Sequence, residues 1–303
     1  MRVLFMGTTD FAAACLDSVI RAGHEVVCVC TQPDRKKNRG MKLIFNPVKD
    51  YAINAHIDII QPTAMKSPET TELIASYKAD IFVVVAYGRI LPKAIIELPP
   101  LGCVNVHASL LPKYRGAAPI QWAVINGEAE TGVTTMYLSE GMDEGDMLEK
   151  AALSIGEYET FGSVYNRLMP LGAELIVSTL SKIEKGTIIK TPQNHSEANY
   201  APPINKDFCP IDWSNEPRVI ANKSRGLDPK PGATSVFNSK TYKLFSPKLT
   251  ANTSTLNNGS IVSTGKQGIE IACGNGKTLI IQELQAEGGK RMKAADYLRG
   301  HTL

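Results

Sequence analysis

The feature that most constrains the fold is the apolar segment at residues 81–87, which reads IFVVVAY. It is the longest purely apolar stretch in the 303 residues, and its seven residues are far fewer than the about 20 that a membrane-spanning helix needs. Its short length and β-branched content indicate a strand that is buried on both faces. Such a strand is typical of the centre of a parallel sheet.

Strand-like and helix-like segments alternate through the first half of the chain. Asn46-Pro47 and Ser67-Pro68 each place a capping side chain before a proline at the first helical position. The alternation predicts an α/β domain with a doubly wound, mostly parallel sheet. The predicted strands lie at residues 2–6, 25–31, 81–86, 103–107 and 133–138, and the predicted helices at 11–21, 47–55, 69–77, 117–126 and 161–184.

The pattern changes near residue 190. Prolines and asparagines interrupt any periodicity between 190 and 206, which indicates a linker. We therefore expect an α/β domain at 1–189, a linker at 190–206 and a small β-barrel domain at 207–303, for which the oligonucleotide-binding (OB) type is one candidate. The barrel rests on five short β-like runs at 234–237, 241–245, 259–264, 268–272 and 278–284.

Charge is distributed unevenly along the chain. Residues 1–204 carry 19 Lys and Arg against 22 Asp and Glu, whereas residues 205–303 carry 14 against 8, which is a net charge of +6. A basic C-terminal third suits a polyanionic partner, but an ordinary lysine-rich surface would have the same composition.

The cysteines argue against a disulfide scaffold. The six are few for this length and lie mostly in apolar contexts, and Cys28-Val29-Cys30 has neither zinc nor redox spacing. We expect reduced, buried thiols and no metal. With no apolar span for a membrane, we expect a cytoplasmic protein, acting as a monomer.

The first strand-to-helix turn reads Gly7-Thr8-Thr9-Asp10. It lacks the further glycines that let a dinucleotide pyrophosphate approach the backbone. A nicotinamide oxidoreductase is therefore disfavoured, although the expected topology would suit one.

The strongest chemical feature is Asn105-Val106-His107 at the end of a predicted strand, where ligands bind in open α/β sheets. Residues two apart on a strand point to the same side, so an amide and an imidazole converge. Such a pair suits acyl transfer, because the amide can stabilise an oxyanion and the imidazole can move protons. A merely structural pair at a strand end is the alternative.

A second cluster, Gly141-Met142-Asp143-Glu144-Gly145-Asp146-Met147, places three carboxylates among glycines. It could bind a cation or form a turn. Alternatively, one of its carboxylates could be the partner of His107, which would fix the tautomer of the ring.

Taken together, these motifs resemble the folate-dependent formyltransferases, and the resemblance covers nearly the whole chain. It is carried by residues 105–112 (NVHASLLP), 115–119 (RGAAP) and 141–146 (GMDEGD), supported by 5–11 (FMGTTDF), 31–35 (TQPDR), 211–213 (IDW) and 229–233 (PKPGA).

The resemblance implies transfer of a formyl group from 10-formyltetrahydrofolate to the α-amino group of methionine on initiator methionyl-tRNA. The family's catalytic Asn, His and Asp correspond to Asn105, His107 and Asp143. In these roles Asn105 stabilises the oxyanion and His107 shuttles the proton, while Asp143 orients the ring or holds a relay water. The implied chemistry requires no metal.

Folate needs an apolar slot with a few hydrogen bonds. Residues 87–90 follow the apolar strand and are expected to line one wall, and residues 109–112 correspond to the folate-contacting segment of the family. The expected folate-binding residues are Tyr87, Gly88, Arg89, Ile90, Ser109, Leu110, Leu111 and Pro112.

Residues 35–42 read RKKNRGMK and hold five basic residues and no acidic one. Such a loop could be charged only because it is exposed to solvent. A basic loop also suits contacts with phosphates. In the resembled family, this loop is inserted at the acceptor end of the tRNA. The run of residues 36–38 departs from the proline and small residues of relatives. The expected tRNA-binding residues are Arg35, Lys36, Lys37, Arg39 and Lys42.

Other activities remain as alternatives. Another 10-formyltetrahydrofolate-dependent formyltransferase or hydrolase, acting on a small amine or on water, would share the trio but would not need the basic loop. A non-catalytic tRNA-binding protein would not need Asn105, His107 and Asp143 together.

Overall fold

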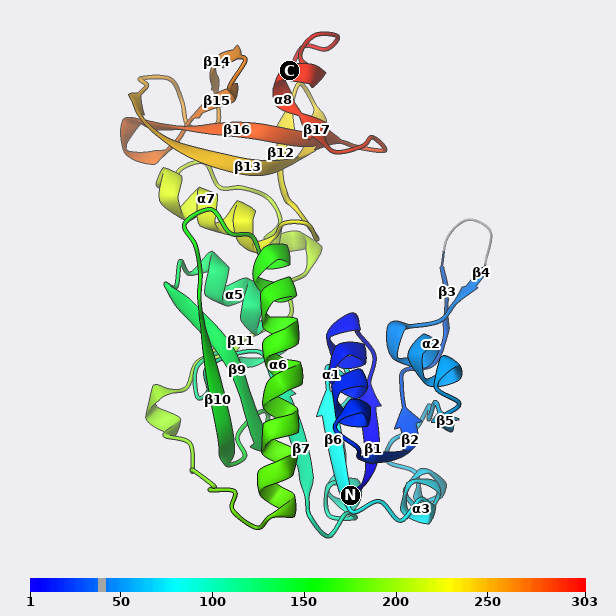
Figure 1. The fold of residues 1–303 in the computed structure, drawn as a ribbon. Coiled ribbons are helices and arrows are strands. Elements are labelled where there is room, and N and C mark those ends of the chain that lie inside the picture. Colours follow the sequence, from blue (N-terminus) through cyan, green and yellow to red (C-terminus); the bar gives the residue numbers. More distant parts are fainter. Residues whose placement is uncertain (38–41) are drawn as a thin grey trace. The chain divides into compact units, whose positions relative to one another are not determined.

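The computed structural model describes residues 1–37 and 42–303 (Figure 1). It divides into two compact units whose segments alternate along the chain. Unit 1 comprises Met1–Gly116, Gly132–Leu153 and Asn166–Tyr200, and unit 2 comprises Ala117–Thr131, Ser154–Tyr165 and Ala201–Leu303. The domain limits expected at residues 189 and 207 stay a prediction.

The main sheet has the strand order β10-β9-β7-β6-β1-β2-β5 among the described residues. The pairs β1–β2, β1–β6, β2–β5 and β6–β7 are parallel, and β7–β9 is antiparallel. All five residues of β6 are buried, as the apolar run predicts. The mostly parallel α/β sheet is thus confirmed. Its strands are β1 (Arg2–Gly7), β2 (Glu25–Cys30), β5 (Ile59–Ile60), β6 (Ile81–Val85), β7 (Cys103–His107), β9 (Glu130–Tyr137) and β10 (Met147–Ser154).

The predicted helix starts are confirmed at the level of single hydrogen bonds. The Asn46 side chain accepts from the backbone N–H of Lys49, and the Ser67 side chain accepts from that of Thr70, so both cap a helix whose first residue is proline. The helices are α1 (Asp10–Arg21), α2 (Pro47–Asn54), α3 (Pro68–Ser76), α4 (Lys93–Ile96), α5 (Pro119–Ile125) and α6 (Phe161–Glu184).

The turn from β1 into α1 explains why Gly7 stands there. A β carbon at Gly7 would lie 2.7 Å from Cβ of Ala12 and 2.8 Å from a ring carbon of Phe5. The glycine therefore allows α1 to pack closely on β1.

Short elements decorate unit 1. The chain after β2 forms an antiparallel hairpin of β3 (Arg35–Lys37) and β4 (Lys42–Ile44), which Figure 1 shows projecting beyond α2. β8 (Arg115–Gly116) and β11 (Tyr200–Ala201) form a two-stranded sheet, and the 3₁₀ turn η1 (His195–Glu197) precedes β11.

The C-terminal part of unit 2 is an antiparallel sheet with the order β12-β13-β16-β15-β14, and β17 pairs with β16. These strands confirm the predicted β structure, while closure into an OB-type barrel stays a prediction. The strands are β12 (Ala233–Phe237), β13 (Lys240–Thr253), β14 (Ile261–Gly265), β15 (Gly268–Ala272), β16 (Lys277–Ala286) and β17 (Met292–Lys293).

Four helical elements not predicted from the sequence complete the described part of unit 2. The longest is α7 (Pro217–Gly226), which packs on α5 within the same unit. The shorter ones are the 3₁₀ turns η2 (Lys206–Phe208) and η3 (Gly274–Gly276), and α8 (Ala294–Tyr297) follows β17.

All six cysteines are free and buried, as expected. Over residues 1–37 and 42–303, no helix has the length and apolar character needed to cross a bilayer. The same residues contain no cluster of three His, Cys, Asp or Glu side chains suited to a metal ion.

Candidate active site

The predicted site residues gather where parallel strands of unit 1 end. Val84 of β6 pairs with Asn105 of β7, and Val85 pairs with Val106, so β6 and β7 end side by side. Gly7, the last residue of β1, pairs with Val85. Residues 86–90 and 108–116 therefore leave the sheet at one edge, the edge where open α/β sheets bind ligands.

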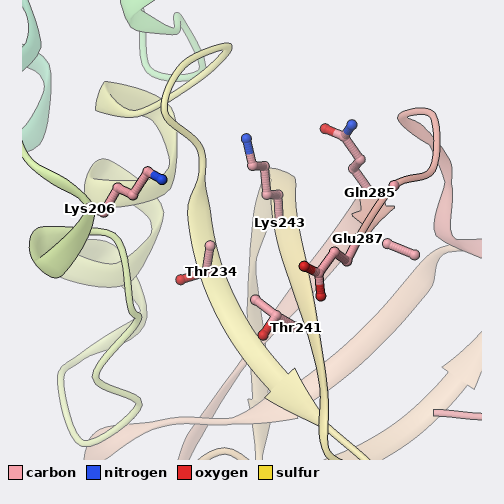
Figure 2. Close-up of a pocket in the computed structure, with 8 residues that line it drawn as sticks. Lys206, Thr234, Thr241, Lys243, Gln285 and Glu287 are labelled. Carbon is pink, nitrogen blue, oxygen red and sulfur yellow. The ribbon is translucent and has the colours of Figure 1, made fainter. Parts of the chain in front are cut away.

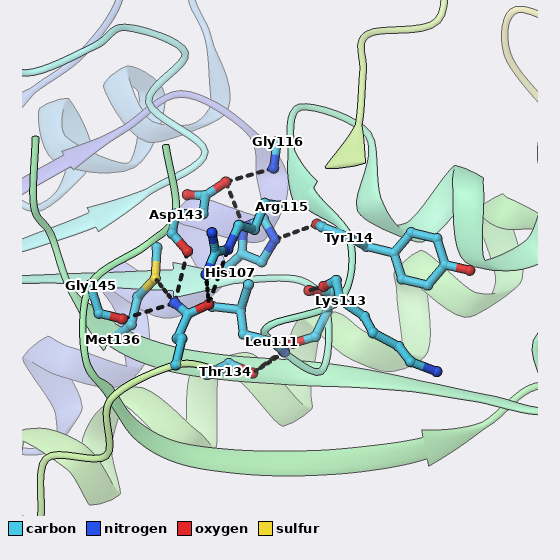
Figure 3. A network of polar contacts seen from close by, with 12 residues as sticks. His107, Leu111, Lys113, Tyr114, Arg115, Gly116, Thr134, Met136, Asp143 and Gly145 are labelled. Atoms are coloured by element: carbon cyan, nitrogen blue, oxygen red, sulfur yellow. Dashed lines mark hydrogen bonds and ion pairs between the residues drawn. The ribbon is translucent and has the colours of Figure 1, made fainter. Parts of the chain in front are cut away.

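His107 is buried at this edge, with a polar group beside each ring nitrogen (Figure 3). Its Nε2 lies 2.9 Å from the carbonyl oxygen of Tyr114. Since a carbonyl only accepts, Nε2 carries a proton, and the tautomer is set. The other nitrogen, Nδ1, lies 3.6 Å from Oδ2 of Asp143. The structure thus brings His107 and Asp143 together, as the partner interpretation of the acidic cluster expects, and it also forms a turn at Met142 and Asp143.

Asp143 is itself fixed by the backbone around it. Its Oδ2 accepts a hydrogen bond of 2.7 Å from the backbone N–H of Gly116. Its φ of +54° lies in the left-handed region, which non-glycine residues seldom adopt. Such a backbone conformation persists only where surrounding contacts impose it, and the hydrogen bond from Gly116 is one such contact.

Asn105 lies two residues before His107 on β7 and is 9% exposed. Across the described residues its side chain takes part in no hydrogen bond, and its amide atoms are not sealed from solvent. A buried amide normally finds a partner inside the protein. The uncommitted amide of Asn105 is therefore free to bond an atom of a ligand.

The segment 109–112 is clamped onto β9. The hydroxyl of Thr134 donates to the carbonyl of Ser109 at 2.7 Å and accepts from the backbone N–H of Leu111 at 3.1 Å. Lys150 donates to the carbonyl of Leu111. Leu111 is buried, whereas Leu110 and Pro112 are half-buried and can contact a ligand.

The segment 87–90 divides into one core residue and three that reach solvent. The Tyr87 ring is buried in the core, and its hydroxyl donates to Sδ of Met65 at 3.2 Å. Gly88 and Ile90 are exposed, the latter by 79%, and Arg89 is half-buried and donates to the carbonyl of Thr63. Burial raises the pKa of the Tyr87 hydroxyl, which accords with a structural rather than a proton-transferring role.

The expected tRNA-binding loop is only partly described. The hairpin carries the backbone of Arg35, Lys36, Lys37 and Lys42, and Arg39 lies outside the described residues. The base of this hairpin is anchored at Asp34, which accepts hydrogen bonds from Lys49 and Gln61.

Several polar residues around the trio were given no role by the sequence. Arg115 is 1% exposed, and its Nε and Nη2 donate to Oε1 of Gln193 at 3.1 Å and 2.8 Å. Its Nη1 lies 3.3 Å from Glu144 and 3.4 Å from Nδ1 of His195. Gln193 and His195 both lie in the segment 190–206, which the sequence predicts to be a linker. Among these residues, only Arg115 belongs to a motif that could have pointed to the site.

Unit 2 contains a hollow of about 480 Å³ in its β structure (Figure 2). It presents two ammonium groups, from Lys206 and Lys243, and one carboxylate, from Glu287. Its remaining lining residues are Thr234, Thr241, Gln285, Ala286 and Gly288.

Comparison with known proteins assigns the family. Residues 1–180 match the formyl transferase family, and residues 203–302 match the formyl transferase C-terminal domain. A protein of Acetivibrio thermocellus named methionyl-tRNA formyltransferase is 44% identical over 304 residues, which cover 100% of this chain and 97% of that protein. One of the same name from Citrifermentans bemidjiense is 46% identical over 100% of this chain and 94% of that protein.

Solved structures agree at the level of the fold. HypX from Aquifex aeolicus in complex with tetrahydrofolic acid superposes with a TM-score of 0.67 at 19% identity, over 98% of this chain and 47% of that chain. An N-formyltransferase from Helicobacter canadensis in complex with folinic acid and dTDP-3-aminofucose superposes with a TM-score of 0.65 at 20% identity, over 92% and 98%. The chain therefore belongs to the formyl transferase family, and within it to the group of relatives named methionyl-tRNA formyltransferase.

Proposed function

We propose that the protein transfers the formyl group of 10-formyltetrahydrofolate to the α-amino group of methionine on initiator methionyl-tRNA. The observation that carries this proposal is the meeting of His107 and Asp143 beside the uncommitted amide of Asn105. The name shared by relatives at 44% and 46% identity over the whole chain supports the choice of acceptor.

Asn105 acts on the oxygen of the formyl group. When the amine attacks the formyl carbon, negative charge develops on that oxygen, and a pre-placed donor lowers the barrier without reorganising. The side-chain amide of Asn105 is such a donor, because no group in the described protein occupies it. The same uncommitted amide is the feature of this site that fits a formylated folate.

His107 moves the proton. The attacking amine must be neutral, and free α-amino groups titrate near 7.7–8.0. Because Nε2–H is committed to the carbonyl of Tyr114, the nitrogen that accepts the amine proton is Nδ1. The carboxylate of Asp143 stabilises the resulting imidazolium. Attack forms the new C–N bond and a tetrahedral oxyanion. When this oxyanion collapses to a carbonyl, the bond from the former formyl carbon to N10 breaks, and His107 returns the proton to N10.

The folate is held by the two segments that flank the catalytic strand. Leu110 and Pro112 supply partly exposed apolar surface on one side, and Ile90 supplies it on the other. The family match over residues 1–180 includes both segments. Clamping of residues 109–111 by Thr134 means that this surface is pre-formed, which lowers the cost of ordering on binding.

The tRNA is held by basic residues in both units. In unit 1 these are Arg35, Lys36, Lys37, Arg39 and Lys42, and in unit 2 they include Lys206 and Lys243 of the hollow in Figure 2. Phosphate contacts of this kind position a nucleic acid without reading its sequence. The net charge of +6 on residues 205–303 supports the assignment.

The test is incubation with methionyl-tRNA and 10-formyltetrahydrofolate, followed by release and detection of N-formylmethionine. The wild type should form the product, and Asn105→Ala should form it at least about a hundredfold more slowly. Parallel incubations with an amino sugar nucleotide and with no amine test the two alternative acceptors. Formylation of the sugar, or hydrolysis to free formate without formylmethionine, would reject the proposal.

A further inference from the structure

The segment 191–199 of unit 1 is hydrogen-bonded to the segments around the site at its start, its middle and its end, although its sequence suggests a linker. At its start, Thr191 and Met147 exchange two backbone hydrogen bonds of 2.9 Å. Gln193 is 7% exposed. At the far end, the carbonyl of Asn199 accepts from the backbone N–H of Arg115 at 2.9 Å. A linker that only joins two units would need none of these contacts.

Gln193 holds the loop that carries Asp143. Its Nε2 donates to the carbonyls of Asp143 and Gly145, each at 2.8 Å. Its Oε1 accepts the two hydrogen bonds from the buried guanidinium of Arg115. Because arginine only donates, the orientation of the amide is fixed and its N–H₂ group must face the loop.

The loop needs such support at two positions. Asp143 has a positive φ, and a β carbon on Gly145 would lie 1.8 Å from the carbonyl oxygen of Tyr137. The loop is strained at Asp143 and closely packed at Gly145, so it keeps its shape only where surrounding contacts impose it.

Asn199 holds the peptide that orients His107. The Oδ1 of Asn199 accepts a hydrogen bond from the backbone N–H of Tyr114, a residue with a φ of +61°. The carbonyl of the same Tyr114 accepts the Nε2 proton of His107. Two residues of one segment therefore fix the two loops that carry or orient the catalytic pair.

We propose that residues 191–199 form a catalytic strap, in which Gln193 is a positioning residue for Asp143 and Asn199 is a positioning residue for His107. This proposal rests on the proposed function for its kinetic consequences, but its geometric consequences are independent of the reaction.

The kinetic test compares Gln193→Glu in the wild type and in an Asp143→Asn background. Glutamate keeps the acceptor for Arg115 but places an oxygen against the carbonyls of Asp143 and Gly145, so the loop must move. In the wild type, kcat should fall by up to about 10²-fold, a typical result of misplacing a catalytic group, while KM for methionyl-tRNA stays within about twofold. In the Asp143→Asn background the same substitution should change kcat by less than about threefold.

The matched control is Glu72→Gln, an exposed site on α3 of unit 1, outside the strap, with the opposite change of charge. It should leave kcat and KM unchanged. An equal loss from Gln193→Glu in both backgrounds would overturn the positioning role of Gln193, as would a kcat equal to that of the wild type.

A spectroscopic test stands apart from the reaction and decides the role of Asn199. In long-range ¹H–¹⁵N spectra at alkaline pH, the His107 ring, assigned by comparison with His107→Gln, should show a proton on Nε2 in the wild type. In Asn199→Ala the ring should shift to a mixture of tautomers, and an unchanged Nε2–H pattern would overturn the proposal for this residue. If the wild type forms no formylmethionine, the proposed function fails. The spectroscopic measurement still tests whether Asn199 positions His107, because it does not depend on the reaction.

Discussion

Replacing Asn105 by alanine should separate catalysis from stability. The Asn105 side chain makes no hydrogen bond within the described protein, so its removal leaves no internal polar group unpaired. The loss of packing should therefore cost about 1 kcal/mol, which lowers Tm by roughly 2–4 °C for a chain of this size. Removal of one oxyanion donor costs about 2.7–4 kcal/mol in the transition state, or about 10²–10³ in kcat.

The assay is single-turnover formylation of methionyl-tRNA together with calorimetric unfolding of the same preparations. Asn105→Asp is the matched variant, because it keeps the shape of the side chain but places a negative charge beside the oxygen that becomes negative. It should be at least as slow as the alanine variant. A single-turnover rate for Asn105→Ala within threefold of the wild type would refute the oxyanion role, and so would a fall in Tm large enough to explain the inactivity by unfolding.

Three further outcomes follow from charge and burial. If the basic residues contact tRNA phosphates, the logarithm of the affinity for methionyl-tRNA should fall linearly with the logarithm of the salt concentration. Replacing both Lys36 and Lys37 by alanine should make this dependence less steep. A wild-type affinity that does not change with salt would exclude phosphate contacts. Burial of Asp34 acts to raise the pKa of its carboxyl, but hydrogen bonds from Lys49 and Gln61 outweigh it and lower this pKa. The stability that the ionised carboxylate contributes is therefore present at neutral pH and is lost as the pH falls below the ordinary value near 3.9. In urea unfolding, Asp34→Asn should be less stable than the wild type at pH 7, with the difference closing in acid, and a difference that does not change with pH would contradict this. Burial raises the pKa of Cys30 to about 11 and that of Cys28 to about 12. A thiol reagent at neutral pH should therefore modify the cysteines of the native protein slowly, and all six quickly in denaturant. Rapid modification of the native protein would contradict their burial.

Much of unit 1 could be predicted because its signals are local. The apolar run at β6, the capping residues before Pro47 and Pro68, and the uninterrupted helix at Phe161–Glu184 are each encoded by neighbours in sequence. The convergence of Asn105 with His107 follows from the two-residue period of a strand. By contrast, β10 and α7 were not predicted, since neither carries a long apolar run.

The support of the site could not be predicted, because it depends on contacts between distant segments. Gln193 bonds the carbonyl of Asp143, 50 residues away, and the side chain of Arg115, 78 residues away. A single glutamine after Pro192 has no spacing or periodicity that would distinguish it. A buried arginine is equally hard to foresee, since its charge predicts a surface position until its partners are known.

The central claim is that His107 and Asp143 act as one unit on the proton of the attacking amine. The most direct measurement is the single-turnover formylation rate of Asp143→Ala, made once in the wild type and once in His107→Ala. In the wild type the substitution should lower the rate by about 10²-fold or more, and in the His107→Ala background by less than about threefold. An equal loss in both backgrounds would show that the two side chains work independently, and it would contradict the mechanism.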